Sequence, residues 1–132
     1  MDEPRWVSRL VVETIHFLQL AEHGGRRGMR DAGLLDASLA RPRHRWAYEP
    51  DSDVVGLAAA YAWAILRNHP FLDGNKRVAF MTAATLLGLN GYQLVAPEQE
   101  VVAVMIRAAA SDLDEDDLAA WFQRHVRRST GA

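Results

Sequence analysis

Apolar side chains recur every three or four positions along most of the chain, which is the spacing of helices with one buried face. The pattern predicts an all-α fold of about six helices. The expected helices cover residues 6–21, 31–39, 52 or 53 to 68, 76–89, 97–110 and a last segment from 114 that turns Leu118, Trp121, Phe122 and Val126 inward. Residues 92–95 are expected to form a short extended piece, and residues 1–132 read as a single domain without internal repeat or linker.

The third and fourth expected helices are apolar around most of their circumference, which predicts that they form the centre of the bundle. A polar loop, residues 69–75, joins them. Because a residue before proline is biased out of right-handed helical geometry, the third helix should end at or just before His69. Phe71 is expected to anchor the loop to the core, and residues 128–132 should form a frayed tail.

The composition fits one cytoplasmic domain. At 132 residues the chain is long enough to bury about two-thirds of its unfolded surface, and it contains no cysteine for a disulfide or a thiolate metal site. No apolar run approaches the ~20 residues that span a bilayer, and the charged N-terminus does not resemble a signal peptide. The formal net charge of −2 argues against a general nucleic-acid binder. We therefore expect a cytoplasmic protein without direct contact to membrane or nucleic acid.

The residues most suited to chemistry are concentrated in the segment HPFLDGNKR, residues 69–77. It contains Lys76, the single lysine of a chain with fourteen arginines, at the start of an apolar helical pattern. Free backbone N–H groups and the positive end of the helix dipole attract anions at such a start, and a glycine lets a ligand approach closely. The segment therefore predicts a phosphate site.

Each residue of this segment also has a structural explanation when it is taken alone. His69 could cap a helix, Asp73 could be the N-cap of the next helix, and Gly74 could be a turn residue. Lys76 and Arg77 could be solvated surface. A structural turn does not need a base, a carboxylate and two cations within one loop, so the combination favours a functional site.

HPFLDGNKR is similar to the signature of the Fic/Doc family, in which a histidine, a phenylalanine, an acidic residue, a small residue, an asparagine and an arginine occur at these spacings between two helices. Three further segments, residues 25–36, 40–42 and 46–49, resemble the N-terminal half of Doc-type proteins. The resemblance covers about residues 5–127. It implies a compact Fic-type helical bundle with the active loop between two central helices.

Two positions distinguish the branches of this family. Fic proteins that transfer AMP generally carry glycine at the position of Lys76 and a second arginine at the position of Phe80. Both departures resemble Doc, the toxin of Phd/Doc toxin–antitoxin modules. The resemblance then implies a kinase that transfers the γ-phosphate of ATP to a threonine of elongation factor Tu and so arrests translation. Doc-type sequences can carry a second asparagine later in the helix, and residues 80–82 offer none.

Two alternative functions stay open. A nucleotidyl transferase that adds AMP to a protein hydroxyl would keep the same fold and cleft, although Phe80 argues against it. A catalytically inactive module that binds an antitoxin or another partner would have lost the chemistry, although the intact set of His69, Asp73 and Asn75 argues against that.

The resemblance gives roles to six residues of the segment, His69, Asp73, Gly74, Asn75, Lys76 and Arg77. His69 would take the proton of the attacking hydroxyl, which suits an imidazole near neutral pH. Asp73 would hold Mg²⁺, a cation that prefers oxygen ligands and bridges phosphate oxygens. Gly74, Asn75 and Lys76 would supply backbone donors to ATP. The Asn75 amide would add a further donor, and the two cations would neutralise phosphate charge.

The segment 41–51, which contains Pro42 as the expected end of the second helix, is the candidate for docking the protein substrate. In Fic relatives this interval carries a flap that aligns the target. Arg43 and Arg45 are the candidate docking residues, together with Arg67, which could equally be a surface residue. Alternatively the segment is a connecting loop whose aromatic residues fill the edge of the core. In either case its arginines should be exposed.

The resemblance further implies a Phd-like antitoxin whose otherwise disordered tail folds on the protein. We expect the tail to bind a groove flanked by the first helix and the region 24–45, where apolar side chains could accept an amphipathic helix. Arginines at the rim of this groove would pair with acidic residues of the tail: Arg26, Arg27, Arg30 and Arg43.

Overall fold

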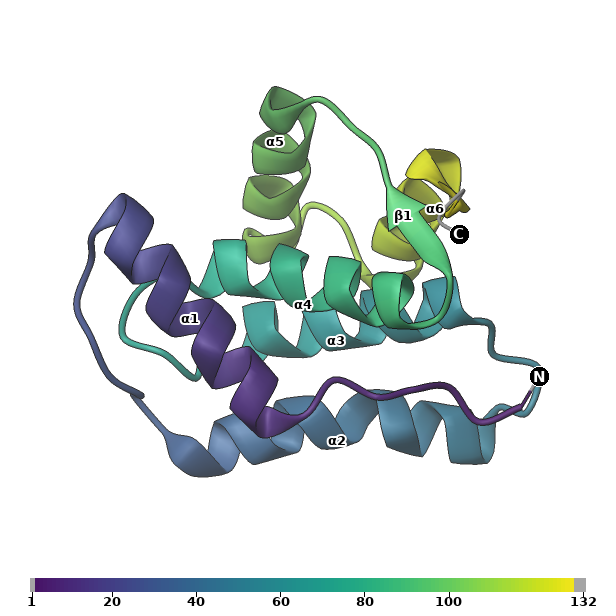
Figure 1. Ribbon diagram of the computed structural model, residues 1–132, viewed down its shortest axis with the longest axis horizontal. Helices are drawn as coiled ribbons and strands as arrows, with labels where there is room; N and C mark the ends of the chain where they lie inside the picture. The colour runs from purple at the N-terminus through teal and green to yellow at the C-terminus, as the bar shows by residue number, and fades with distance from the viewer. Residues whose placement is uncertain (1, 130–132) are drawn as a thin grey trace.

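The computed structural model describes residues 2–129 and shows six helices and two short strands within them (Figure 1). The elements are α1 (Arg9–His23), α2 (Ala32–Tyr48), α3 (Val54–Asn68), α4 (Asn75–Leu89), β1 (Tyr92–Leu94), α5 (Glu98–Ala109), α6 (Glu115–His125) and β2 (Val126–Arg128). This architecture confirms the predicted helical bundle.

Helix α3 forms the centre of the bundle, as its apolar circumference predicted. It packs against α4, α2 and α6, and most of its side chains are buried. Figure 1 shows α3 and α4 side by side, with α1 crossing α4 and α2 along the lower edge. Five alanines of α3 are buried and let the neighbouring helices approach closely: Ala58, Ala59, Ala60, Ala62 and Ala64. The loop between α3 and α4 is therefore held by the two best-packed helices.

The predicted capping residues begin their helices. The side chains of Asp31, Asp53 and Asp114 accept hydrogen bonds from backbone N–H groups in the first turns of α2, α3 and α6. Asp117 completes a capping box with Asp114. Ser8 caps α1, which therefore begins three residues later than the apolar pattern indicated. These bonds satisfy donors that have no partner within the helix.

Helix α2 continues through Pro42 to Tyr48, so the prediction that it ends near residue 39 is wrong. Proline removes one backbone donor, here to the oxygen of Ser38, but it leaves the rest of the helix intact. Pro42 is buried, so packing on the core stabilises the helix across this position. The expected docking flap or connecting loop over 41–51 is correspondingly absent from the described residues, because most of the segment is helical.

The C-terminal part of the described chain pairs with the extended piece after α4. Strands β1 and β2 are antiparallel, with Leu94 opposite Val126 and Tyr92 opposite Arg128. The Ser129 N–H also donates to the oxygen of Gly91 at 2.9 Å. The prediction of a frayed tail is therefore wrong for residues 128 and 129, while residues 130–132 lie outside the described part. Val126, expected on the last helix, is half-buried in β2.

No helix within residues 2–129 is both long enough and apolar enough to cross a membrane.

Candidate active site

The predicted loop lies between α3 and α4 and begins with an unusual backbone. Helix α3 ends at Asn68, as the following proline predicted, and His69 adopts the left-handed conformation with φ 52° and ψ 55°. Its N–H still donates to the oxygen of Ile65 at 2.9 Å. This conformation is uncommon outside glycine and is found often at functional sites. The side chain of His69 is thereby placed at the exposed surface of the loop.

Phe71 anchors the loop, as predicted. It is 1% exposed, and its ring stacks on the imidazole of His16 from α1, with centroids 3.9 Å apart and an angle of 14° between the planes. His16 is itself buried, and its Nε2 lies 3.0 Å from the backbone oxygen of Asp73. Since a carbonyl only accepts, Nε2 of His16 is the donor of this bond. The first helix therefore supports the loop at two points.

The Asn75 side chain closes the loop from within. Its Oδ1 accepts from the Phe71 N–H at 3.0 Å, and its Nδ2 donates to the Phe71 oxygen at 2.9 Å. The same Nδ2 lies 3.1 Å from Nδ1 of His69. Asn75 is 3% exposed. The structure therefore directs this amide into the loop, where the sequence had predicted a contact with phosphate.

Asp73 is not the N-cap of α4, so the alternative prediction that it caps this helix is wrong. The N-cap is Gly74, in the left-handed region with φ 84°, and it makes no side-chain cap bond. Oδ2 of Asp73 instead accepts from the backbone N–H of Arg26 at 2.6 Å. That bond orients the carboxylate and leaves Oδ1 as the atom that can bind a cation.

The segment 24–31 forms a second support that sequence reasoning did not assign to the site. The N–H of Arg30 donates to the oxygen of Pro70 at 2.7 Å, and the N–H of Leu72 donates to the oxygen of Gly28 at 3.1 Å. Close approach requires glycine at Gly25, where a Cβ atom would lie 3.2 Å from the Cβ of Asp73. The signal available in the sequence was the group of glycines Gly24, Gly25 and Gly28. All three adopt positive φ in the structure.

The part of the site with groups suited to an anion is the first turn of α4. Lys76 and Arg77 are exposed there, and the helix start adds free N–H groups and a partial positive charge. The structure thus brings the predicted imidazole, carboxylate, glycine and cations together in one loop. Within residues 2–129 no group of three or more metal-binding side chains occurs, and Asp73 is the one carboxylate of the loop 69–75 that could face a cation. Such a set fits Mg²⁺, which is often held by one or two carboxylates together with phosphates and water.

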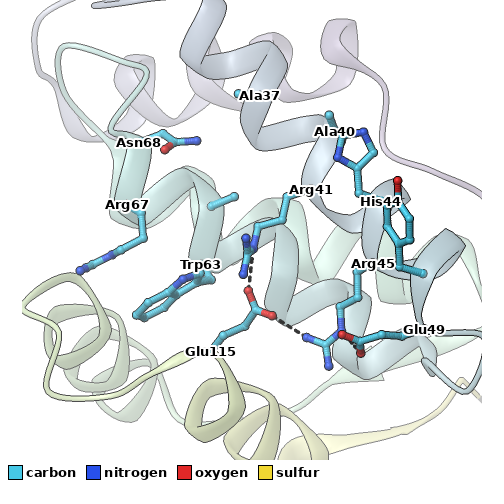
Figure 2. Close-up of a pocket in the computed structure, with 12 residues that line it drawn as sticks. Ala37, Ala40, Arg41, His44, Arg45, Glu49, Trp63, Arg67, Asn68 and Glu115 are labelled. Carbon is cyan, nitrogen blue, oxygen red and sulfur yellow. Dashed lines mark hydrogen bonds and ion pairs between the residues drawn. The ribbon is translucent and has the colours of Figure 1, made fainter.

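The three candidate docking arginines are not brought together. Arg67 donates to the oxygens of Ala108 and Ala109 at 2.7 and 2.6 Å, and it also bonds Ser111. Its guanidinium lies over the ring of Trp63, 4.6 Å from the centroid. Figure 2 shows it directed away from the centre of the neighbouring pocket. Arg67 therefore caps the C-terminal end of α5, which favours the alternative that it is a surface residue over a role in docking.

Arg45 and Arg43 also have internal partners. Arg45 and Arg41 bind the two carboxylate oxygens of Glu115 at 2.6 and 2.8 Å (Figure 2). With only 20% of its side chain exposed, Arg45 contradicts the expectation of an exposed arginine. Arg43 lies over the ring of Trp6, 5.2 Å from the centroid.

A cavity of about 520 Å³ lies between α2, α3 and the start of α6, and it is bordered by Arg41, Arg45 and Glu115 but not by Arg43 (Figure 2). The cavity reaches the loop only through Asn68, next to His69. Of the two aromatic residues expected at the edge of the core, Trp46 packs there, whereas Tyr48 is 84% exposed at the cavity.

Comparison with known proteins agrees with this geometry. The model of the Fic/DOC family matches residues 6–87, which include α1 to α3, the loop and most of α4. The chain is 32% identical over 120 residues to a protein named Protein kinase doc from Escherichia phage P1, covering 91% of this chain and 94% of that protein. It is 39% identical over 100 residues to Toxin Doc from Mycolicibacterium smegmatis, covering 74% of this chain and 77% of that protein. The chain belongs to the Fic/Doc family.

The fold is also similar to a solved structure. This is the N-terminal Fic domain of a putative cell filamentation protein, a VirB-translocated effector from Bartonella quintana, with bound ADP. The TM-score is 0.50 at 18% identity, and the match covers 73% of this chain and 49% of that chain. At this identity the likeness shows the Fic-type fold alone.

Proposed function

We propose that this protein is a Doc-like toxin kinase, which transfers the γ-phosphate of ATP to a threonine of a translation factor, elongation factor Tu, and so arrests translation. The observation that carries the proposal is the pair of Lys76 and Phe80. Lys76 is exposed in the first turn of α4, whereas Phe80 packs against the core and supplies no phosphate contact. The relative named as a protein kinase supports the same branch.

ATP would bind with its phosphates at the start of α4. Gly74, with φ 84° and no Cβ, lets the phosphates approach the backbone donors of the first turn. Lys76 and Arg77 would neutralise the charge that moves between the transferring and leaving phosphates. The solved Fic domain with bound ADP supports a nucleotide at this fold.

Asp73 would hold Mg²⁺ through Oδ1, because Oδ2 is bound by the Arg26 N–H. When bound, the ion would neutralise negative charge on the phosphates. The contact with Arg26 keeps the carboxylate in one orientation before any ligand arrives.

His69 would receive the proton of the threonine hydroxyl. Its backbone N–H donates to the oxygen of Ile65 and its backbone oxygen accepts from Arg30, so the imidazole is presented from a fixed position. In phosphoryl transfer most of the catalysis comes from positioning and electrostatics, which suits a loop that is supported from α1, from 24–31 and from its own amide.

The target would approach beside the α2–α3 cavity. Because Arg41, Arg45 and Arg67 have internal partners, the groups available there are the exposed His44 and Tyr48. A translation target implies action in the cytoplasm, and a toxin of this kind implies an antitoxin that neutralises it. The antitoxin is proposed from the two Doc relatives.

The test is to incubate the protein in a translation extract with ATP labelled separately at the α- and γ-phosphates. Label from the γ-position should appear on one protein target, and His69→Ala should abolish it without unfolding the protein. Label from the α-position would instead assign AMP transfer. No transfer of either label to any protein would leave a binding module as the better description.

A further inference from the structure

The orientation of the Asn75 amide is determined by its neighbours. Its Oδ1 accepts the Phe71 N–H at 3.0 Å, so its Nδ2 must face the Phe71 oxygen at 2.9 Å and Nδ1 of His69 at 3.1 Å. The exchanged amide would oppose oxygen to oxygen and N–H to N–H at Phe71. Because Asn75 is 3% exposed, water does not replace these contacts.

This orientation decides which nitrogen of His69 carries the proton. An amide nitrogen only donates, so Nδ1 of His69 must accept and must have its lone pair free for Asn75. A neutral imidazole with a lone pair on Nδ1 carries its hydrogen on Nε2. In this tautomer neither nitrogen offers a lone pair to a substrate hydroxyl.

We propose that Asn75 is a positioning residue that holds His69 of the free protein in the Nε2–H tautomer, and that His69 accepts a proton only after this contact opens. The catalytic part of the proposal rests on the proposed function. Because Nδ1 faces Asn75, the hydroxyl would approach Nε2, and a lone pair on Nε2 appears only when the ring proton has moved to Nδ1. Nδ1 can carry that proton only when the amide has turned away, because otherwise two donors would face each other.

The size of such an effect is known from serine proteases. There, replacing the carboxylate that faces the catalytic imidazole by an amide gives the wrong tautomer and lowers kcat by roughly 10⁴-fold. The loop of this protein contains such an amide, that of Asn75, naturally. A proton acceptor would therefore be withheld until the amide moves.

A bound phosphate would compete for the Asn75 amide and so turn it away from His69. Asn75 is the first residue of α4 and is followed directly by the exposed cations Lys76 and Arg77. A phosphate oxygen at this helix start competes with His69 for the hydrogens of Nδ2. Nucleotide binding would then free the imidazole, so that the base forms only in the presence of the phosphate donor.

NMR of the full chain labelled with ¹⁵N-histidine tests this directly, with the His69 signals assigned from a His69→Gln variant. At a pH where the ring is neutral, we expect wild-type His69 to be protonated on Nε2 and not on Nδ1. Asn75→Asp should reverse the tautomer, because a carboxylate accepts from Nδ1–H. The matched control is Asn68→Asp, one residue before His69, whose amide bonds Ser38 at 2.9 Å and should leave the tautomer unchanged. Saturating MgATP should shift wild-type His69 towards the Nδ1–H form.

A free wild-type ring with its proton on Nδ1 would overturn the proposal, and so would an unchanged tautomer in a folded Asn75→Asp protein. If that variant does not fold, the wild-type spectrum still decides. A ring that stays in the Nε2–H form while MgATP is visibly bound would overturn the release by nucleotide. Failure of MgATP to bind at all would contradict the proposed kinase function, whereas the tautomer of the free protein would still be determined.

Discussion

The guanidinium of Arg30 holds the backbone of His69. Its Nε lies 2.8 Å from the backbone oxygen of His69, and a terminal nitrogen lies 2.7 Å from that of Asn68. Carbonyls at the end of a helix have no partner within it. His69, with φ 52°, adopts a conformation that costs a residue with a side chain about 1–2 kcal/mol. The two bonds from Arg30 therefore stabilise both the end of α3 and the strained residue.

Arg30→Ala should lower phosphoryl transfer by about 10- to 100-fold, because the imidazole would lose its fixed position. The free energy of unfolding should fall by about 1–2 kcal/mol from the lost hydrogen bonds. Arg30→Lys should restore only part of both, since an ammonium does not reproduce the planar fork. Urea unfolding and single-turnover transfer measure the two effects.

Arg27→Ala is the control for this experiment, because Arg27 lies in the same segment but contacts the ring of Phe17, with its guanidinium carbon 5.8 Å from the centroid. It should behave like the wild type. Full transfer activity in a folded Arg30→Ala protein would show that Arg30 is not needed to position His69.

The helix starts were predictable because caps are local. Asp31, Asp53 and Asp114 each accept from the N–H three residues further on, so the signal lies within one turn of sequence. The course of α2 was not predictable in this way. Whether a helix continues through Pro42 depends on packing from α3 and elsewhere, which the residues around the proline do not report.

The candidate site shows the same division. HPFLDGNKR is contiguous, so the groups that would act on phosphate were found from sequence. The supports of the loop come from far along the chain: His16 contacts Asp73 across 57 positions, and Arg30 contacts His69 across 39. The direction of the Asn75 amide and the internal use of Arg67 depend on atomic neighbours that no spacing rule specifies.

Arg67 should matter for stability and not for chemistry. Arg67→Ala removes its bonds to the last carbonyls of α5 and its contact with Trp63, so the free energy of unfolding should fall by about 1–2 kcal/mol. At temperatures below its unfolding transition, Arg67→Ala should transfer phosphate at the wild-type rate. Arg107→Ala, an exposed change in the last turn of the same helix, is the matched control. A large loss of activity in Arg67→Ala without loss of stability would instead support a role for Arg67 in docking the substrate.

Tyr61 ties the segment before α1 to the core. Its hydroxyl accepts from the Val7 N–H at 3.1 Å and donates to the Val7 oxygen at 3.3 Å, and the residue is fully buried. Tyr61→Phe would leave two backbone groups unpaired, so the free energy of unfolding should fall by about 1–3 kcal/mol. Tyr48→Phe, at a side chain that is 84% exposed, should have no effect. Chemical denaturation of the three proteins measures this.

The raised pKa of Tyr61 predicts that the free energy of unfolding falls at alkaline pH. Burial raises the pKa of Tyr61, while the contact with Val7 and the charge of Arg43 oppose the rise. The unfolded phenol, with a pKa of about 10, therefore ionises first. This contribution is fully present below pH of about 10 and is lost as the pH rises through the folded value. Above that pH, the free energy of unfolding should fall less steeply with pH for Tyr61→Phe than for wild type. Equal slopes of the free energy of unfolding against pH would show that Tyr61 is not the group responsible.

An antitoxin helix has a possible contact surface on α1, where Leu10, Phe17 and Leu18 are each more than half exposed. Arg27 borders it through Phe17. The guanidinium of Arg43, on α2, lies over the ring of Trp6, whereas that of Arg27 lies over Phe17 on α1, so the two arginines contact different aromatic residues. The expected rim of four arginines is therefore not continuous, and Arg30 is already bound to the loop.

The product of a neighbouring gene, co-expressed and purified with the protein, should bind more weakly to Leu18→Asp and to Arg27→Glu, and more weakly at high salt. Arg43→Glu should bind nearly as the wild type does. Affinities measured by calorimetry at two ionic strengths distinguish these cases. Wild-type affinity in both Leu18→Asp and Arg27→Glu would show that the antitoxin binds another face of the protein.

Lys76 tests the phosphate chemistry most directly. An exposed ammonium beside the start of α4 is a compact charge, so its removal should lower γ-phosphate transfer by about 10²-fold or more, in the range seen for single groups that stabilise developing charge. Lys76→Ala removes the charge and keeps a good helix former, whereas Lys76→Gly also loosens the first turn. Lys76→Arg should retain intermediate activity because the guanidinium is longer and planar. Single-turnover transfer at saturating ATP, with unfolding measured in parallel, separates the loss of charge from the loss of helix. Equal activity in all four proteins would mean that the single lysine of this chain does not act on the transferred phosphate.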